Sequence, residues 1–131
     1  MKDKPARRKI LVIDDDKDLR EVMAELLEKA GYLAISAANG ADGVRINERE
    51  NPDIIVLDLC MHGMDGIETL RRIREQDREV GVIILTANGS SETVREAVGL
   101  SASEYLSKPF ENRELIGLIG DLLWRRMLVH K

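Results

Sequence analysis

Three short segments of the chain consist only of apolar residues, most of them β-branched. They are "ILVI" at residues 10–13, "IIVL" at 54–57 and "VIIL" at 82–85. A strand with one face in water alternates apolar and polar residues, whereas a strand covered on both faces is apolar throughout. Strands of the second kind occur almost only in parallel sheets that carry helices on both sides. The three segments therefore predict an α/β fold.

Segments with helical periodicity separate the strands. Apolar residues recur at helical spacing from Leu19 to Ala30, and Gly31 is a typical helix stop. We expect strands at residues 9–14, 32–38, 53–59, 81–87 and 103–107, and helices at about 19–30, 40–50, 65–76, 90–98 and 111–128. The pair Asn39-Gly40 is typical of a hairpin, but the helix that follows it excludes one. Five strands that alternate with five helices indicate right-handed crossovers and a doubly wound parallel sheet.

Composition limits the class of protein. The 131 residues are 44% apolar and 34% charged, which suits one globular domain, at residues 9–128, with an extension at 1–8 and a tail at 129–131. No apolar run approaches the roughly 20 residues of a membrane span, and the run after the basic N-terminus is too short for a signal peptide. Cys60 is the only cysteine, so no internal disulfide forms and a cytoplasmic location is expected. The net charge of −4 argues against nucleic acid as a direct partner.

Charged and hydroxyl side chains stand at the ends of the predicted strands. The first strand runs into Asp14, Asp15 and Asp16, the third contains Asp58, the fourth reaches Thr86, and Lys108 follows the fifth. Ligands of open parallel sheets bind beyond the carboxyl ends of the strands. These side chains should therefore converge on one edge of the sheet.

Carboxylates crowded in one crevice repel one another, and the repulsion raises their pKa values unless a counter-charge is present. A hard divalent cation with oxygen ligands, Mg²⁺ or Mn²⁺, relieves it. Zn²⁺ would need histidines and cysteines, which are few and scattered here. A carboxylate beside Mg²⁺, a lysine and a hydroxyl suits phosphoryl transfer, with the carboxylate as nucleophile. Neither common Gly-rich phosphate motif is present, so ATP or a dinucleotide is not expected to bind directly.

With these polar residues at the strand ends, the sequence resembles the receiver domain of two-component response regulators. The matching motifs are "VIDDD" at residues 12–16, "VLDLCMHGMDGIE" at 56–68, "ILTA" at 84–87 and "YLSKPF" at 105–110. The motifs stand in the expected order, each at a strand end, and the resemblance runs from about Lys9 to Leu128, nearly the whole chain. The resemblance implies a flavodoxin-like sheet with strand order 2-1-3-4-5.

The resemblance also implies roles for individual residues. Asp58 is the phosphoacceptor, and Asp14, Asp15, Asp58 and the backbone carbonyl of Cys60 hold Mg²⁺. Thr86 hydrogen-bonds the transferred phosphoryl group, and Lys108 pairs with Asp58 and then with that group. The Lys108–Pro109 bond is expected to be cis. Tyr105 is the aromatic that moves inward with Thr86 when the domain switches.

The partner implied is a sensor histidine kinase or a histidine phosphotransfer domain, whose phosphohistidine donates the phosphoryl group. The surface formed by the fourth helix, fifth strand and fifth helix is expected to change its partner or form a homodimer. The domain would catalyse its own phosphorylation and dephosphorylation without being a classified enzyme. Whether it is free-standing or part of a larger protein is left open.

The sequence departs from the family pattern at a few positions. His62 stands where the family usually has proline, and Ser101 stands where glycine usually turns the fourth helix into the fifth strand, so a left-handed turn there would be strained. Cys60 and Asn88 occupy positions that influence the access of water to the acyl phosphate. The lifetime of the phosphorylated state is therefore open.

Several of these residues have ordinary structural interpretations as well. Asp16 directly precedes a helix and is more readily explained as its N-cap than as a metal ligand. Thr86 is also a common strand residue, Lys108 taken alone is a surface lysine, and Tyr105 is possible as a static, half-buried aromatic. Trp124 is expected to pack or to border an interface.

Two other functions compete with a phosphoacceptor domain. One is a Mg²⁺-dependent phosphatase that forms an aspartyl phosphate. Such enzymes have a D-x-D motif after the first strand, and Asp14 and Asp16 have the same spacing. The position two residues further is Asp18, where such enzymes have threonine or valine. The other is a scaffold that acts without phosphate, against which the complete set of polar residues at the strand ends argues.

Overall fold

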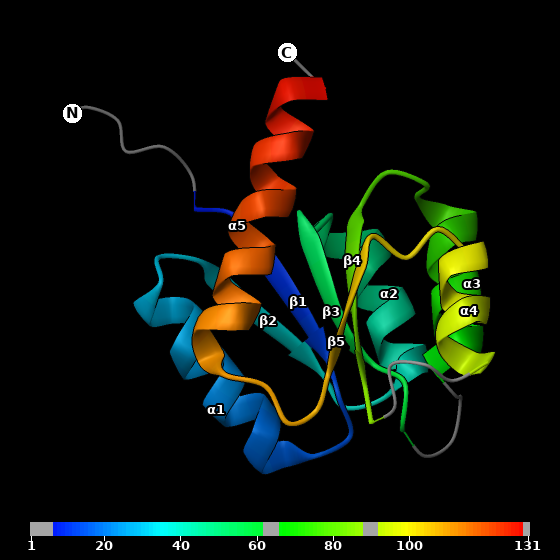
Figure 1. The fold of residues 1–131 in the computed structure, drawn as a ribbon, viewed down its shortest axis with the longest axis horizontal. Helices are drawn as coiled ribbons and strands as arrows, with labels where there is room; N and C mark the ends of the chain where they lie inside the picture. Colours follow the sequence, from blue (N-terminus) through cyan, green and yellow to red (C-terminus); the bar gives the residue numbers. More distant parts are fainter. Residues whose placement is uncertain (1–6, 62–65, 88–91, 130–131) are drawn as a thin grey trace.

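Five parallel strands form one sheet in the order β2-β1-β3-β4-β5, with helices on both faces (Figure 1). The computed structural model describes residues 7–61, 66–87 and 92–129. The strands are β1 (Lys9–Ile13), β2 (Leu33–Ala37), β3 (Ile54–Asp58), β4 (Gly81–Thr86) and β5 (Glu104–Ser107). The helices are α1 (Lys17–Lys29), α2 (Gly40–Glu50), α3 (Gly66–Gln76), α4 (Glu92–Gly99) and α5 (Asn112–Val129). The predicted doubly wound fold, its strand order and its five helices are confirmed.

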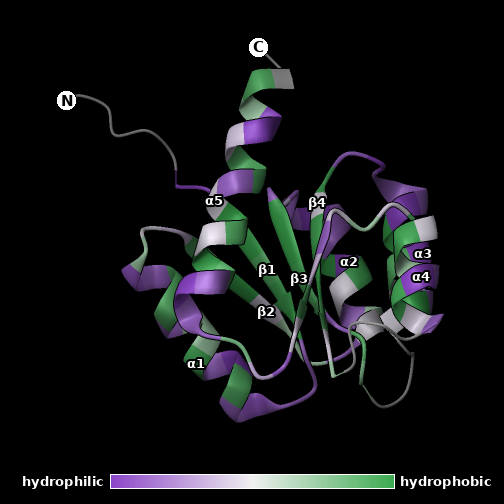
Figure 2. Cartoon of the chain, in the orientation of Figure 1, coloured by the Kyte–Doolittle hydropathy of each residue, from purple (hydrophilic) through white to green (hydrophobic). Residues whose placement is uncertain are grey.

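The apolar strands divide their side chains between two cores, because successive residues of a strand point to opposite faces. On one face Leu11 and Ile55 lie in a core completed by α2, α3 and α4. On the other face Val12 and Val56 lie in a core completed by α1 and α5. Figure 2 shows the hydrophobic colour along β1 and β3, between the two helical layers. Burial on both faces explains why these strands are apolar at every position.

Short polar side chains begin the first two helices. The Asp16 side chain accepts a hydrogen bond from the Leu19 backbone N–H, so the predicted N-cap of α1 is confirmed. Asn39 caps α2 in the same way, by accepting from the Asp42 N–H at 2.8 Å. The Asn39-Gly40 pair therefore starts a helix, as expected, and does not form a hairpin. Gly31 follows α1 with φ +97, a conformation that glycine adopts without strain.

The last turns of α5 extend beyond the edge of the sheet (Figure 1). Their apolar side chains are consequently exposed: Trp124 is 59% accessible and Leu128 50%. Trp124 therefore contributes little to the core, and the interpretation as an interface edge remains a prediction. None of the helices in the described residues is long and apolar enough to cross a membrane.

Arg74, near the end of α3, joins three segments on the α3–α4 side of the sheet. Its guanidinium donates to the backbone carbonyls of Asp77, Val80 and Ser101 at 3.2, 2.7 and 2.6 Å. Ser101 forms the turn between α4 and β5 with φ +66, so this turn is left-handed as expected. The β-carbon makes such a backbone conformation costly for any residue except glycine. Part of the free energy of the Arg74 contacts thus offsets strain at Ser101.

Replacing Ser101 with glycine should stabilise the domain. The variant Ser101→Gly removes the β-carbon and keeps the carbonyl that Arg74 contacts, so we expect a gain of about 1 kcal/mol in the free energy of unfolding, or about 3 °C in melting temperature. Thermal and urea unfolding measure it. The matched control is Ser36→Gly on β2, where the backbone φ is not positive and the substitution should destabilise. A loss of stability in both variants would contradict strain at Ser101.

Candidate metal and phosphoryl-transfer site

Three aspartates meet at the carboxyl edge of the sheet. Asp58 is the last residue of β3 and Asp14 follows β1 directly; the register pairs Ile13 with Leu57, so the two aspartates lie side by side. Carboxylate oxygens of Asp14, Asp15 and Asp58 all lie within 4.8 Å of one another. Asp14 and Asp58 are almost fully buried, at 1% and 4% accessibility. We call these three residues the acidic rim.

Asp14 is held in place from two sides, but no cation in the described part of the chain forms an ion pair with it. Its Oδ1 accepts the backbone N–H of Asp16 at 3.0 Å, and its backbone carbonyl accepts the Arg20 guanidinium at 2.8 Å. Its buried Oδ2 has no hydrogen-bond partner among the described residues. Burial raises the pKa of Asp14, and the negative charges of Asp58 and Asp15 raise it further against the opposing effects of the Asp16 N–H and Lys108.

Lys108 supplies positive charge at the acidic rim. Its ammonium lies 3.2 Å from Oδ2 of Asp58, and the backbone N–H of Cys60 donates to Oδ1 of Asp58 at 2.9 Å. The backbone N–H of Lys108 donates to the carbonyl of Thr86 at 2.8 Å, which ties the end of β5 to the end of β4. The Lys108–Pro109 peptide bond is cis. The three clustered carboxylates thus lie beside an ammonium that is paired with Asp58.

The acidic rim fits a hard divalent cation. Its donors are oxygens, its charge is negative, and the partnerless Oδ2 of Asp14 is a polar group that burial leaves unsatisfied. Mg²⁺ is bound in proteins through one or two carboxylates and several waters. Zn²⁺ does not fit, because the described rim contains no histidine and Cys60 takes part through its backbone. Asp14, Asp15 and Asp58 would hold the ion.

The predicted site residues do not all lie together. Asp14, Asp15, Asp58 and Lys108 converge, and Thr86 is buried at the end of β4, next to the Lys108 backbone. Asp16 points away into its helix cap. Tyr105 is 47% exposed and lines a cavity of 200 Å³ between α4 and β5, with Val94, Ala97 and Val98 among its neighbours. His62 and Asn88 lie outside the described residues.

Two residues that support the rim were missed in the sequence. Arg20 lies one turn into α1, and its contact with the Asp14 carbonyl follows from the path of the chain around the helix start. Gly66 begins α3, where a β-carbon would lie 2.5 Å from the Cα of Leu59, the residue after Asp58. A glycine at the first position of a helix, shortly after an acidic strand end, is the signal that indicates such a close approach.

Comparison with known proteins gives matches over most of the chain. A family model described as "Response regulator receiver domain" matches residues 10–120. The sporulation initiation phosphotransferase F of Bacillus subtilis is 39% identical over 107 residues, which cover 82% of this chain and 86% of that protein.

Solved structures are similar over most of the chain. A CheY-like receiver domain protein from Methanospirillum hungatei is 25% identical with a TM-score of 0.89, over 93% of this chain and 98% of that one. The receiver domain of a sensor histidine kinase from Pseudomonas aeruginosa is 31% identical with a TM-score of 0.82, over 89% and 98%. That second structure has a magnesium ion coordinated in its active site cleft.

The raised pKa of Asp14 predicts a pH-dependent cost of folding without metal. The folded protein holds the Asp14 proton more tightly than the unfolded chain, whose value is about 3.8, so stability falls as the pH rises through the window between the two pKa values. Asp14→Asn keeps the Oδ1 acceptor and cannot ionise. In chelator, its melting temperature should exceed that of the wild type by an amount that grows with pH across this window and then levels off. Asp121→Asn, at an exposed position on α5, controls for the loss of a carboxylate; a difference that shrinks with rising pH would contradict the prediction.

Neutralising Asp15 should have opposite effects without and with Mg²⁺. In chelator, Asp15→Asn reduces repulsion in the acidic rim, so we expect a higher melting temperature than in the wild type. Mg²⁺ at 100 times its dissociation constant should stabilise the wild type by about 2.7 kcal/mol, and Asp15→Asn by clearly less. Differential scanning calorimetry measures both. Asp18→Asn, in the first turn of α1 and outside the rim, should respond to Mg²⁺ like the wild type; equal responses in all three proteins would contradict the site.

Proposed function

Because the chain belongs to the response regulator receiver domain family, we propose that Asp58 accepts a phosphoryl group with the help of Mg²⁺ held at the acidic rim. As a receiver domain it acts in two-component signal transduction. The observation that carries the proposal is the position of the buried Asp58 carboxylate, which lies 3.2 Å from the Lys108 ammonium and has oxygens of two further carboxylates within 4.8 Å. A carboxylate so placed can act as nucleophile toward a phosphohistidine of a sensor kinase or phosphotransfer domain.

The acidic rim, Lys108 and Thr86 have separate roles in the phosphoryl transfer. An oxygen of Asp58 forms the new bond to phosphorus while the bond between phosphorus and the donor histidine nitrogen breaks, and the nitrogen keeps the electron pair. The Lys108 ammonium leaves Asp58 to contact the phosphoryl oxygens, and the Thr86 hydroxyl hydrogen-bonds one of them. When bound, Mg²⁺ would neutralise charge that develops on these oxygens. The carbonyl of Cys60 is proposed as a further metal ligand.

We propose Thr86 and Tyr105 as the switch that reports phosphorylation. Thr86 pairs with Ser107 on β5, and Tyr105 lies two residues earlier on that strand. The exposed Tyr105 ring borders the 200 Å³ cavity between α4 and β5, which leaves room for it to move inward. A shift of this kind would change the surface of α4, β5 and α5, where we place the contact with a partner or a homodimer. The cytoplasmic location and the lack of nucleic-acid binding stay predictions.

The phosphatase alternative is not favoured. It needs a second aspartate two residues after the nucleophile in the active site, and Asp16 instead caps α1 and is exposed. The proposed nucleophile, Asp58, lies at the end of β3, whereas the nucleophile of such a phosphatase would be Asp14, after β1. A scaffold that acts without phosphate remains an outcome of the experiment below.

Acetyl phosphate and Mg²⁺ should add one phosphoryl group to the wild type, as intact-protein mass spectrometry would show. Asp58→Asn should abolish the addition, and Lys108→Ala should slow it. Asp42→Asn, on α2 and paired with Arg45, is the matched control and should be phosphorylated like the wild type. A modification that persists in Asp58→Asn would refute the assignment, and a wild type that neither accepts phosphate nor binds Mg²⁺ would favour the scaffold.

A further inference from the structure

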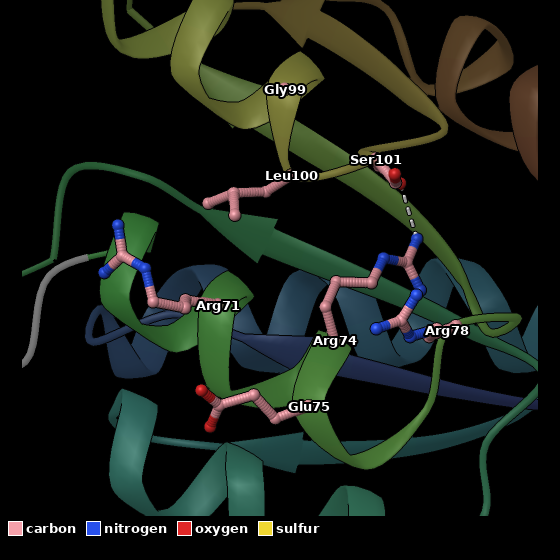
Figure 3. A pocket seen from close by; sticks show the side chains of 7 residues that line it. All are labelled: Arg71, Arg74, Glu75, Arg78, Gly99, Leu100 and Ser101. Carbon is pink, nitrogen blue, oxygen red and sulfur yellow. Dashed lines mark hydrogen bonds between the residues drawn. The ribbon is translucent and has the colours of Figure 1, made fainter.

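A cavity of 330 Å³ lies between the C-terminal ends of α3 and α4. Figure 3 shows the seven residues that line it, Arg71, Arg74, Glu75, Arg78, Gly99, Leu100 and Ser101. Helices of a parallel α/β fold run opposite to the strands, so this end of α3 and α4 is remote from the acidic rim. The cavity is therefore distinct from the phosphoryl-transfer site. We call it the arginine cavity.

The charge of Arg74 in this cavity is not neutralised by its hydrogen bonds. The three groups to which its guanidinium donates are backbone carbonyls, and its buried Nε has no partner in the described part of the chain. Burial lowers the pKa of Arg74, and Arg126 lowers it further, while Asp77 acts in the opposite direction. Arginine nevertheless stays protonated in proteins. The wall of the cavity thus carries a partly buried positive charge.

The other charged residues of the arginine cavity leave its balance positive. Arg78 is exposed, and no carboxylate of the described residues forms an ion pair with it. Arg71 pairs with Glu68 at 2.6 Å, but Glu68 also binds Arg72 on the same helix. Glu75 is the only acidic residue in the lining, and in Figure 3 its carboxylate points away from Ser101 and the Arg74 guanidinium. The Ser101 side of the cavity is the natural place for an anion.

We propose that the arginine cavity binds a small organic phosphomonoester, with the phosphate next to Arg78 and Arg74 on the Ser101 side of the cavity (Figure 3). Guanidinium groups present paired N–H donors that match the spacing of phosphate oxygens, and they remain charged at every physiological pH. A volume of 330 Å³ lies at the lower end of the range for small-molecule sites and suits a ligand the size of a nucleoside monophosphate. Leu100 and Gly99 give an apolar wall for the organic part.

A ligand in this cavity would connect α3 to the segment that leads from α4 into β5. A ligand held by Arg74 and Arg78 on the α3 side and by the backbone near Ser101 on the α4 side would bridge the two helices. Ser101 leads into β5, which carries Tyr105 and ends before Lys108. The ligand would therefore favour one position of the α4–β5 segment over others.

Binding is tested on the full chain in EDTA, so that metal-dependent binding at the acidic rim does not contribute. The probes are adenosine monophosphate, inorganic phosphate and adenosine, titrated by calorimetry and followed by amide NMR. We expect saturable binding of adenosine monophosphate, weaker binding of inorganic phosphate and none of adenosine. Amide shifts should concentrate at Arg74, Arg78 and residues 99–101, away from Asp14 and Asp15.

Variants then distinguish binding in the arginine cavity from a general effect of the protein's net charge. Arg78→Gln should weaken binding by about tenfold, the loss of one charge-assisted contact. Glu75→Gln should tighten it, since a repelling charge is removed. Arg72→Gln is the matched control, because Arg72 lies on the same helix, shares Glu68 and does not line the cavity. These side chains are on the surface, and circular dichroism checks that each variant is folded.

The result of this binding experiment does not depend on whether Asp58 is phosphorylated. Retention of binding in Lys108→Ala, together with tenfold weaker binding in Arg78→Gln, would support the proposal even if Asp58 accepts no phosphate. Absence of saturable binding of adenosine monophosphate would overturn it. Equal weakening in Arg72→Gln and Arg78→Gln would also overturn it, since the affinity would then follow net charge and not this cavity.

Discussion

Electrostatic repulsion among Asp14, Asp15 and Asp58 is the constraint around which this domain is organised. Burying carboxylates side by side opposes folding, because each charge loses water and gains a like neighbour. The register of β1 and β3 nevertheless places two of them next to each other. The two apolar cores on either side of the sheet provide the burial that offsets this cost. Lys108, the Asp16 and Cys60 N–H groups and Arg20 then fix the geometry.

Much of this could be predicted from the sequence, for reasons that can be traced to particular residues. Segments such as "IIVL" specify strands covered on both faces, and topology then brings their carboxyl ends together, so Asp14, Asp58 and Lys108 were placed correctly. Contacts to backbone carbonyls were not predictable. Arg74 donates to a backbone carbonyl 27 residues away. Every residue has a backbone carbonyl, so the residue type at the accepting position does not indicate the contact. The exposed position of Tyr105 could not be predicted either, because a side chain on an edge strand such as β5 can point into the protein or out to solvent.

Different charged groups gather at the two ends of the sheet. At the carboxyl edge, β1 and β3 end in acids that attract a cation, and the N-termini of the helices face the same way. At the other edge the C-terminal carbonyls of α3 lie near Arg74 and Arg78, an arrangement in which basic side chains are favoured by the helix dipole. The arginine cavity thus arises where the direction of the helices already gathers positive side chains. The chemistry at each edge follows from the polarity of the parallel fold.

The raised pKa of Asp14 would link the proposed metal binding to proton exchange. In the pH range where Asp14 retains part of a proton, a cation bound at the acidic rim would displace that proton into solution. The apparent affinity for the cation would then rise with pH, and the heat of binding would depend on the ionisation enthalpy of the buffer that takes up the proton. The proposed metal site would thus respond to the acidity of its surroundings independently of phosphoryl transfer.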